Sequence, residues 1–477
     1  MKKLLLILSL FLVFGCGSPE IEIEKKSATN LQKEIFETEF LGSYPDEIIS
    51  SGAVTEYDIE AREESFALIG DKETKTWGYS NTAKPLELRV KLGDTLKVNF
   101  KNSLPDETTI HWHGVRVPNA MDGVPGINQE PINPGESFVY EFVPKDAGTF
   151  WFHPHVRSSE QLERGLKGVL IVEEPEPIGF TKDITWVLDD WFLTSDLEIR
   201  PTFNTPHELM HDGRWGNVIT INGKQKEELL VEVGDRIRLR FVNVANARMF
   251  TPILTDLSAI VFATDGMLVK TPFDYKTTII APGNRIDLDI KITAEMAGKT
   301  FAIGNDYYST DMLGVIEVSN EISGKILPSF ETPKAKKFPN WENIQSLSVD
   351  ETFELDAKNK IVIKDGRSQN VIAWTLNGEI FSEANPINLK KDELTIIEYK
   401  NLSSRLHPMH LHGQFFRVID RNGKNIAEDF WRDTLLVGPR ETIRVALMPT
   451  DTGKWAHHCH ILEHAESGMM NLIEVKE

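Results

Sequence analysis

One pattern recurs three times along the chain, and it restricts the fold more than any other feature of the sequence. In its first half, an Asn follows an Asp by eight or nine residues, at Asp94 and Asn102, at Asp235 and Asn243, and at Asp392 and Asn401. In its second half, a Gly follows a turn-forming Pro, at Pro134 and Gly148, at Pro282 and Gly298, and at Pro439 and Gly453. Internal self-similarity of this kind indicates a repeated structural unit. We therefore expect three copies of one folded unit.

The segments between the turns alternate apolar and polar residues and are broken by Gly, Pro and Asn. Residues 86–92 and 96–100 are clear examples. Alternation with a period of two places the apolar side chains on one face of a β-strand, and many short strands are typical of a β-sandwich. The sequence thus predicts an all-β protein with three consecutive sandwiches, over residues 57–174, 180–320 and 342–477.

The first residues have the pattern of an export signal. Lys2 and Lys3 precede residues 4–14, which are apolar except for Ser9 and too short to span a membrane as a helix. Residues 13–16 resemble the cleavage box of a bacterial lipoprotein, although an ordinary cleaved signal peptide is the alternative. We expect a signal peptide with this box over residues 1–16, lipidation of Cys16 and a tether over residues 17–56. The protein should then be extracytoplasmic and periplasmic, anchored by lipid to a bacterial membrane.

Charge and cysteine content narrow the remaining possibilities. The net charge is −20 at pH 7, which argues against nucleic acid as a partner. The chain has two cysteines, Cys16 and Cys459. If the first carries lipid and the second binds a metal, none remains for a disulfide, so the fold must depend on its apolar core. We expect the protein to act as a monomer.

Ten of the 13 histidines fall into four clusters. The clusters are His111 and His113; His153 and His155; His407, His410 and His412; and His458, His460 and His464. Histidines two apart on a strand share a face, so each pair can bind one metal centre, although a single such pair is more often just a polar strand. The clusters occupy matched positions in the first and third repeats, whereas the middle repeat has Pro252, Ile303 and Asn305 there. His207, His211 and His457 lie outside the clusters and are interpreted as surface or structural residues.

The last cluster surrounds Cys459 and is followed by Met469. A cysteine thiolate, imidazoles and a weak axial thioether form the ligand set of a blue-copper electron-transfer site. On a strand, His458 and His460 would point opposite to Cys459. One short peptide could therefore serve two different metal sites, one on each of its faces.

Taken together, these motifs resemble the signature of three-domain bacterial multicopper oxidases of the laccase-like or cuprous oxidase-like kind. The patterns H-x-H-G, H-x-H, H-x-x-H-x-H and H-C-H-x3-H-x4-M occur in the family's order, and the similarity covers residues 57–475, including residues 121–126. The resemblance implies three cupredoxin-like Greek-key β-sandwich domains. It also implies that the middle one has no copper ligands and that the third holds the type 1 copper.

The resemblance further implies four copper ions, with the following ligands. The type 1 copper would be held by His407, Cys459, His464 and axial Met469; the type 2 copper by His111 and His410; and the two type 3 coppers by His113, His153, His155, His412, His458 and His460. A donor would be oxidised one electron at a time at the type 1 copper. The electrons would pass along the Cys459 peptide to the other three coppers, where O₂ is reduced to water.

Proton delivery to that reaction needs a carboxylate. Asp122 matches an acidic residue near the cluster in similar enzymes, although an Asp before Gly123 could simply form a turn. Many bacterial relatives carry a Glu directly after the last type 1 histidine, where this chain has Ala465. We expect Glu463 or Glu466 to substitute for it.

The electron donor is a small molecule or a metal ion. Cuprous oxidases often carry a methionine-rich insert, but the 11 methionines here are scattered. We therefore favour a laccase-like oxidase of phenol-type donors, with a cuprous or ferrous metallo-oxidase in copper tolerance as the alternative. A non-catalytic interaction protein would have lost ligands, and a simple copper electron carrier would need two histidines rather than ten.

Overall fold

The structure is a computed structural model that describes residues 48–80, 84–176, 178–308, 311–324, 346–364, 367–381, 386–426, 428 and 430–477. The expected signal peptide, Cys16 and residues 17–47 of the expected tether lie outside these ranges. Within them, no helix combines the length and the apolar character needed to cross a membrane.

The first sandwich packs two four-stranded sheets. One has the order β2 (Lys72–Gly78), β1 (Val54–Ile69), β4 (Thr95–Asn102), β6 (Ser137–Phe142); the other has β3 (Leu86–Lys91), β8 (Gly168–Glu173), β7 (Gly148–His153), β5 (His111–His113). β1 runs parallel to β4, with Val54 opposite Thr95. The sandwich therefore begins at Val54 rather than at Tyr57, because residues 54–56 are already paired.

The second sandwich packs a six-stranded sheet on a four-stranded one. The first has the order β10 (Val218–Ile221), β9 (Lys182–Trp191), β12 (Arg236–Asn243), β16 (Arg285–Lys291), β14 (Ala259–Thr264), β15 (Met267–Asp274). The second has β11 (Glu227–Val233), β18 (Met312–Ile322), β17 (Thr300–Asn305), β13 (Pro252–Leu254).

The third sandwich packs sheets of six and five strands. The first has the order β20 (Arg367–Leu376), β19 (Glu351–Lys364), β22 (Thr395–Asn401), β27 (Thr442–Leu447), β24 (Phe416–Arg421), β25 (Lys424–Asn425). The second has β21 (Ile387–Lys390), β29 (Met470–Lys476), β28 (Gly453–Cys459), β23 (His407–Leu411), β26 (Thr434–Val437). The expectation of an all-β fold with three sandwiches is thereby confirmed.

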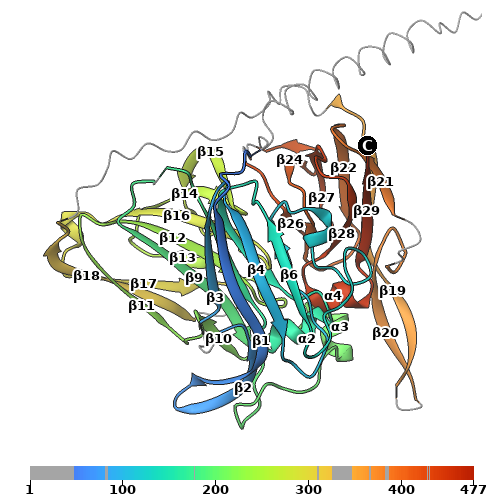
Figure 1. Ribbon diagram of the computed structural model, residues 1–477, viewed down its shortest axis with the longest axis horizontal. Helices are drawn as coiled ribbons and strands as arrows, with labels where there is room; N and C mark the ends of the chain where they lie inside the picture. The colour runs from blue at the N-terminus through green and yellow to red at the C-terminus, as the bar shows by residue number, and fades with distance from the viewer. Residues whose placement is uncertain are drawn as a thin grey trace, which may run out of the picture.

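The described helices are short. They are η1 (Asn119–Met121), α2 (Ser158–Glu163), α3 (Pro206–Met210), η2 (Ala294–Met296) and α4 (Leu462–Ser467). α2, α3 and α4 come from the first, second and third repeats, and they lie close together (Figure 1). Three parts of the chain that are far apart in sequence therefore meet there.

The Asn of each repeat closes its sandwich in the same way. Asn102 ends β4, and its buried Nδ2 donates to the carbonyls of Asp106 and Ile132, both at 2.8 Å. Asn243 and Asn401 likewise donate to the carbonyl four or five residues further on and to one near the second half of their repeat. A buried amide must be hydrogen-bonded, and the same side chain makes the same bonds in each repeat.

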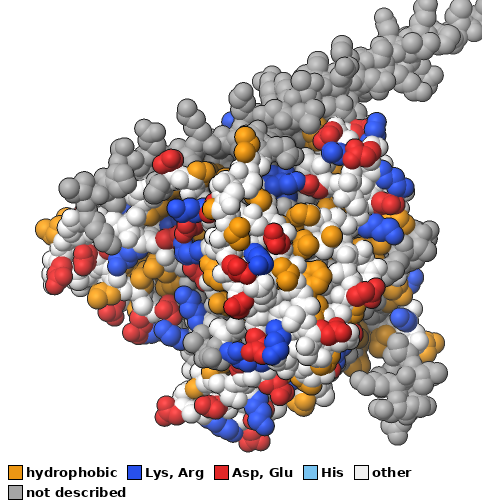
Figure 2. All heavy atoms as spheres, in the orientation of Figure 1, with side chains coloured by type: hydrophobic (Ala, Val, Ile, Leu, Met, Phe, Trp, Pro, Cys, Tyr) orange, Lys and Arg blue, Asp and Glu red, His pale blue; other side chains and the backbone are white. Residues whose placement is uncertain are grey.

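The first and third sandwiches share one continuous apolar core, whereas most of the apolar core of the middle sandwich forms a separate cluster. β5 and β7 of the first sandwich and β23 and β28 of the third carry the histidine clusters. On the face shown in Figure 2, acidic and basic side chains are interspersed. With the net charge of −20, this mixture provides no extended basic surface on that face.

Candidate metal centres

Strand pairing brings the histidine clusters opposite one another. His111 on β5 faces His153 on β7, and His410 on β23 faces His458 on β28. In the middle sandwich the corresponding pair is Pro252 and Asn305. By this pairing, Asn305 rather than Ile303 holds the position of His153.

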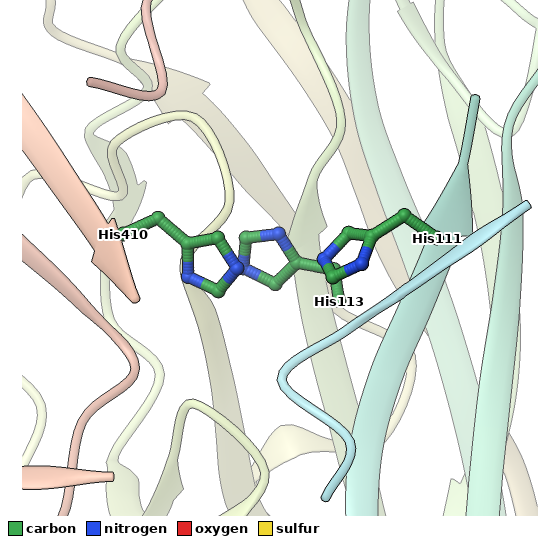
Figure 3. A group of neighbouring side chains, drawn as sticks. All are labelled: His111, His113 and His410. Atoms are coloured by element: carbon green, nitrogen blue, oxygen red, sulfur yellow. The ribbon is translucent and has the colours of Figure 1, made fainter. Parts of the chain in front are cut away.

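Eight histidines from the first and third sandwiches converge at their junction. In three groups of three, the possible ligand atoms all lie within 4.8 Å of one another: His111, His113 and His410; His113, His153 and His460; His155, His412 and His458. Figure 3 shows the first group, with two rings from the first sandwich and one from the third. The rings of His113 and His410 are stacked, with centroids 3.7 Å apart.

The nitrogens that point into this centre fit metal ions. Nε2 of His111, His153 and His410 and Nδ1 of His113 are buried and have no hydrogen-bond partner among the described residues. Both ring nitrogens of His460 are in the same situation. Burial lowers the pKa of His113, His153 and His410 well below its usual value, so these rings are neutral. Neutral imidazole with a free lone pair is the form that binds copper or zinc.

The outward nitrogens of several of these rings bind protein oxygens, which fixes their orientation. Nδ1 of His111 and Nδ1 of His410 each lie 2.9 Å from a backbone carbonyl oxygen, that of Asp122 and that of Asp433. Nδ1 of His458 lies 2.9 Å from the carbonyl oxygen of Cys459. An outer partner of this kind selects the ring tautomer that leaves the inner nitrogen free for a metal.

Asp122 connects two histidines of the centre. It is fully buried, and its Oδ2 lies 2.9 Å from Nδ1 of His412, while Oδ1 lies 3.2 Å from Nδ1 of His111. The next residue, Gly123, has a φ of +84°, and a Cβ there would lie 1.8 Å from the carbonyl oxygen of Ile110. The glycine therefore permits the tight turn that brings the Asp122 carboxylate to the histidines.

The middle sandwich supports the centre with a residue that the sequence did not single out. Arg285, at the start of β16, is fully buried, and its Nη1 and Nη2 donate to the two carboxylate oxygens of Asp433 at 2.9 and 2.7 Å. Oδ1 of Asp433 in turn lies 3.2 Å from Nε2 of His113. The nearby Gly283 has no side chain, and a Cβ there would lie 2.9 Å from the ring of His113. No pattern in the sequence marks Arg285, because only the packing of the domains brings it to Asp433.

A second centre lies within the third sandwich. Sγ of Cys459 is 3.7 Å from Nδ1 of His407 and 3.7 Å from Nδ1 of His464, and these two nitrogens are 3.3 Å apart. All three side chains are fully buried, as is Met469. The backbone N–H of Cys459 donates to the carbonyl of Met469 at 3.0 Å, which ties the last strand to the site. Burial raises the pKa of the Cys459 thiol and lowers that of His464 to about 3.

The outer sides of the two histidines at the Cys459 centre are covered. Nε2 of His407 lies 2.9 Å from Oγ of Ser403, and Nε2 of His464 donates to the carbonyl oxygen of His211 at 2.7 Å. The ring of Trp374 lies 4.3 Å from that of His464, measured between centroids. Its indole N–H donates to the Leu209 carbonyl of α3. The helix α3 and the residues after it therefore form a lid on this centre.

The acidic residues expected near the last cluster lie at the junction with the other two sandwiches. Oε1 of Glu463 accepts a hydrogen bond from Nδ2 of Asn246 at 3.0 Å, and burial raises the pKa of Glu463 to about 7. Glu466 accepts hydrogen bonds from the backbone N–H of Ser159 and from Asn204. These hydrogen bonds join the sandwiches, and they go to residues other than the histidines of the centre.

The three histidines outside the clusters have different surroundings. His457 is fully buried, and its Nε2 lies 3.0 Å from the hydroxyl of Tyr399, so it is structural rather than a surface residue. The rings of His207 and His211 lie 4.5 Å apart. Nδ1 of His211 accepts a hydrogen bond from Arg405 at 2.9 Å, and the guanidinium opposes a metal cation there.

Comparisons with known proteins agree with this geometry. Profiles described as "Multicopper oxidase" match residues 60–177, 182–318 and 352–477. The crystal structure of a multicopper oxidase from Pseudomonas thermotolerans is 33% identical, with a TM-score of 0.77, and the match covers 89% of this chain and all of that one.

Two further solved structures bear different titles. A multicopper oxidase from Campylobacter jejuni, titled a metallo-oxidase, is 25% identical with a TM-score of 0.75, over 92% of this chain and 97% of that one. A laccase from Pediococcus acidilactici is 26% identical with a TM-score of 0.74, over 91% of this chain and 92% of that one.

Proposed function

This chain belongs to the multicopper oxidase family, and from that premise we propose that it oxidises phenol-type donors with four copper ions, as a laccase-like oxidase. It is a copper-dependent oxidoreductase with O₂ as the acceptor. The observation that carries the proposal is the pair of buried centres, one of eight histidines and one of two histidines with Cys459 and, expected as axial ligand, Met469.

The residues present fit the four coppers as follows. The type 1 copper would be held by His407, Cys459, His464 and Met469; the type 2 copper by His111 and His410; and the type 3 pair by His113, His153 and His460 on one side and His155, His412 and His458 on the other. When bound, these ions supply one-electron storage at the first centre and four-electron reduction of O₂ to water at the second.

The protein's own residues prepare this chemistry. The Cys459 peptide joins both centres, because His458 and His460 flank the cysteine and belong to the eight-histidine centre. The carbonyl oxygen of Cys459 also lies 2.9 Å from Nδ1 of His458, and this contact shortens the path between the two centres. Asp122 and Asp433 hold histidines in place, and we assign the delivery of protons to O₂ to Asp122.

An aromatic donor fits the lid on the Cys459 centre better than a metal ion does. Within the described ranges, each group of three possible His, Cys, Asp or Glu ligands lies in one of the two centres rather than in the lid. Arg405 also donates a hydrogen bond to Nδ1 of His211, so this nitrogen is not free to bind a metal ion. The relative titled a metallo-oxidase makes Cu(I) or Fe(II) oxidation the second candidate.

Oxygen consumption with three donors tests the proposal. Copper-loaded protein is supplied with 2,6-dimethoxyphenol, Cu(I) or Fe(II) side by side in an oxygen electrode, and copper is counted by metal analysis. We expect four coppers per chain and the highest kcat/KM with the phenol. Preference for a metal ion would establish the second candidate, and lack of O₂ uptake with all three would refute the oxidase function.

Changing Asp122 to Ala is expected to lower turnover by about 10- to 100-fold, the usual effect of removing an outer partner of a metal-binding histidine. The variant leaves Nδ1 of His412 without its carboxylate. Oxygen consumption and copper content measure the effect. Asp122→Asn should lose less copper than Asp122→Ala, because the amide oxygen can still accept from His412; equal copper loss would contradict the contact.

Changing Met469 to Leu is expected to raise the reduction potential of the blue copper while preserving its colour. Leucine cannot supply the weak axial thioether that moderates the potential. The substitution conserves volume at a fully buried position, so its effect on stability should stay below about 1.5 kcal/mol. Redox titration of the blue band measures the potential, and an unchanged value would show that Met469 is not a ligand.

We further propose that the protein is exported and carries lipid on Cys16. Support comes from the two lysines, the apolar residues 4–14 and the lipoprotein-like box at residues 13–16. In a bacterial host, labelled palmitate should enter the wild-type protein but not Cys16→Ala. Fractionation should place the wild-type protein with membranes and outside the cytoplasm.

A further inference from the structure

An electron donor cannot contact the ring of His464 at the Cys459 centre directly. The side chain of His464 is fully buried, and its outer nitrogen, Nε2, is occupied by the carbonyl oxygen of His211 at 2.7 Å. Electrons must therefore reach His464 through protein atoms. The His211 carbonyl is the first of these atoms outside the centre.

A short bonded path leads outward from this carbonyl. The carbonyl carbon of His211 is bonded to the backbone nitrogen of Asp212. The backbone carbonyl of Asp212 accepts a hydrogen bond from the indole N–H of Trp215 at 3.0 Å. One residue of backbone and two hydrogen bonds thus join the Trp215 ring to the ring of His464.

Trp215 belongs to an aromatic cluster that reaches the surface. Its ring centroid lies 5.8 Å from that of Tyr307 and 5.8 Å from that of Tyr308, and the two tyrosines are 4.8 Å apart and perpendicular. Tyr308 is 85% exposed, although large aromatic side chains normally bury most of their surface. Its φ of +54° is a left-handed conformation that bulky residues rarely adopt. Such backbone conformations are concentrated at functional sites.

The charges around the cluster also suit a neutral aromatic molecule. Arg248 covers one side of Trp215, with its Cζ 4.9 Å from the ring centroid. The Asp212 carboxylate is paired with Arg405 at 2.8 Å. The charges beside the rings are thus balanced, and the exposed ring face of Tyr308 is left to contact a ligand.

We propose that Trp215, Tyr307 and Tyr308 form the docking site for a phenolic donor and that electrons travel from it through Asp212 and His211 to His464. This proposal rests on the proposed oxidase function and specifies where its substrate binds. The ring of the phenol stacks on Tyr308 and Trp215. It loses one electron, which passes along the path to the type 1 centre, and its hydroxyl proton goes to solvent water. The product is a phenoxyl radical, and four such events supply the reduction of one O₂.

Two variants separate docking from electron transfer. Tyr308→Ala removes an exposed ring, so the KM for 2,6-dimethoxyphenol should rise by about two- to tenfold, the range expected for one lost aromatic contact. Trp215→Phe keeps a ring but removes the N–H bonded to Asp212. Anaerobic bleaching of the blue colour at saturating phenol should therefore slow severalfold, while the blue band keeps its intensity.

Two controls show whether these effects are specific. Phe273 is an exposed ring elsewhere on the middle sandwich, and Phe273→Ala should behave as the wild type. Ferrocyanide has no ring to stack, so its KM should be unchanged in Tyr308→Ala. Wild-type phenol kinetics in both cluster variants would overturn the proposal, and so would an equal rise of KM for ferrocyanide. Failure of the oxidase function itself would appear differently, as no O₂ uptake by the wild type with any donor.

Chemical modification supplies a readout that does not depend on turnover. Tetranitromethane should nitrate Tyr308 of the copper-loaded protein, as located by peptide mass spectrometry. Saturating 1,2-dimethoxybenzene, which has the ring but no oxidisable hydroxyl, should slow nitration of Tyr308. It should leave nitration of Tyr57, whose hydroxyl is bonded to the Arg89 carbonyl, unchanged. Unprotected Tyr308 would refute docking at this cluster.

Discussion

Replacing Cys459 with Ser is expected to abolish the blue colour and turnover while leaving the protein folded. Sγ of Cys459 faces Nδ1 of His407 and of His464, each at 3.7 Å, and a soft thiolate is what gives such a centre its colour and its electron-transfer role. A hydroxyl of similar size fits the same buried position but does not ionise. The loss should exceed the about 10- to 100-fold caused by removing an outer partner.

The matched control is the other cysteine of the chain. Cys16→Ser should retain the blue band and the oxidase activity, because Cys16 is expected to carry lipid rather than copper. Circular dichroism should show unchanged β-structure in Cys459→Ser, and metal analysis should show one copper fewer per chain. Oxidase activity retained by Cys459→Ser would refute the proposed mechanism.

Replacing Arg285 with Ala is expected to destabilise the protein by about 3–5 kcal/mol, because it leaves the buried Asp433 carboxylate unpaired. The two side chains are fully buried, and two hydrogen bonds of 2.9 and 2.7 Å join them. Asp433 also contacts His113 through Oδ1 and the type 2 ligand His410 through its backbone carbonyl, so the geometry of the eight-histidine centre should change as well. Thermal unfolding measures the first effect, and the electron paramagnetic resonance signal of the type 2 copper measures the second.

A second buried ion pair distinguishes these two effects. Arg116 pairs with Asp146 in the first sandwich at 2.7 Å, and both side chains are almost fully buried. Arg116→Ala should lower the unfolding temperature but leave the type 2 signal unchanged. If Arg285→Ala altered stability alone, the middle sandwich would have no part in shaping the centre.

The sequence alone was enough to predict the three sandwiches. Their repeated Asn residues and turns mark each copy, since the same buried hydrogen bonds must be made in each. The histidine clusters were also visible, because ligands for one metal centre must be spaced to suit a strand. His111 and His113, two residues apart on β5 and members of one group of possible ligands, are an example. Possible ligands that are close together in the sequence can be recognised from their spacing.

Other features depended on packing between parts of the chain that are far apart in sequence. The contact between Arg285 and Asp433 joins two sandwiches, and no pattern near either residue in the sequence predicts that they meet. The sequence led us to expect that Glu463 or Glu466 delivers protons. It could not show that these two side chains are hydrogen-bonded to residues of the other sandwiches.

The lid on the Cys459 centre shows the difference most clearly. His211 covers His464 with its backbone carbonyl, and every residue has such a group, so side-chain identity carries no signal for this contact. Trp215, Tyr307 and Tyr308 likewise meet only because two separate loops of the middle sandwich pack together. The residues that could bind copper were therefore determined by the sequence, whereas the proposed route by which electrons reach them depends on the tertiary structure.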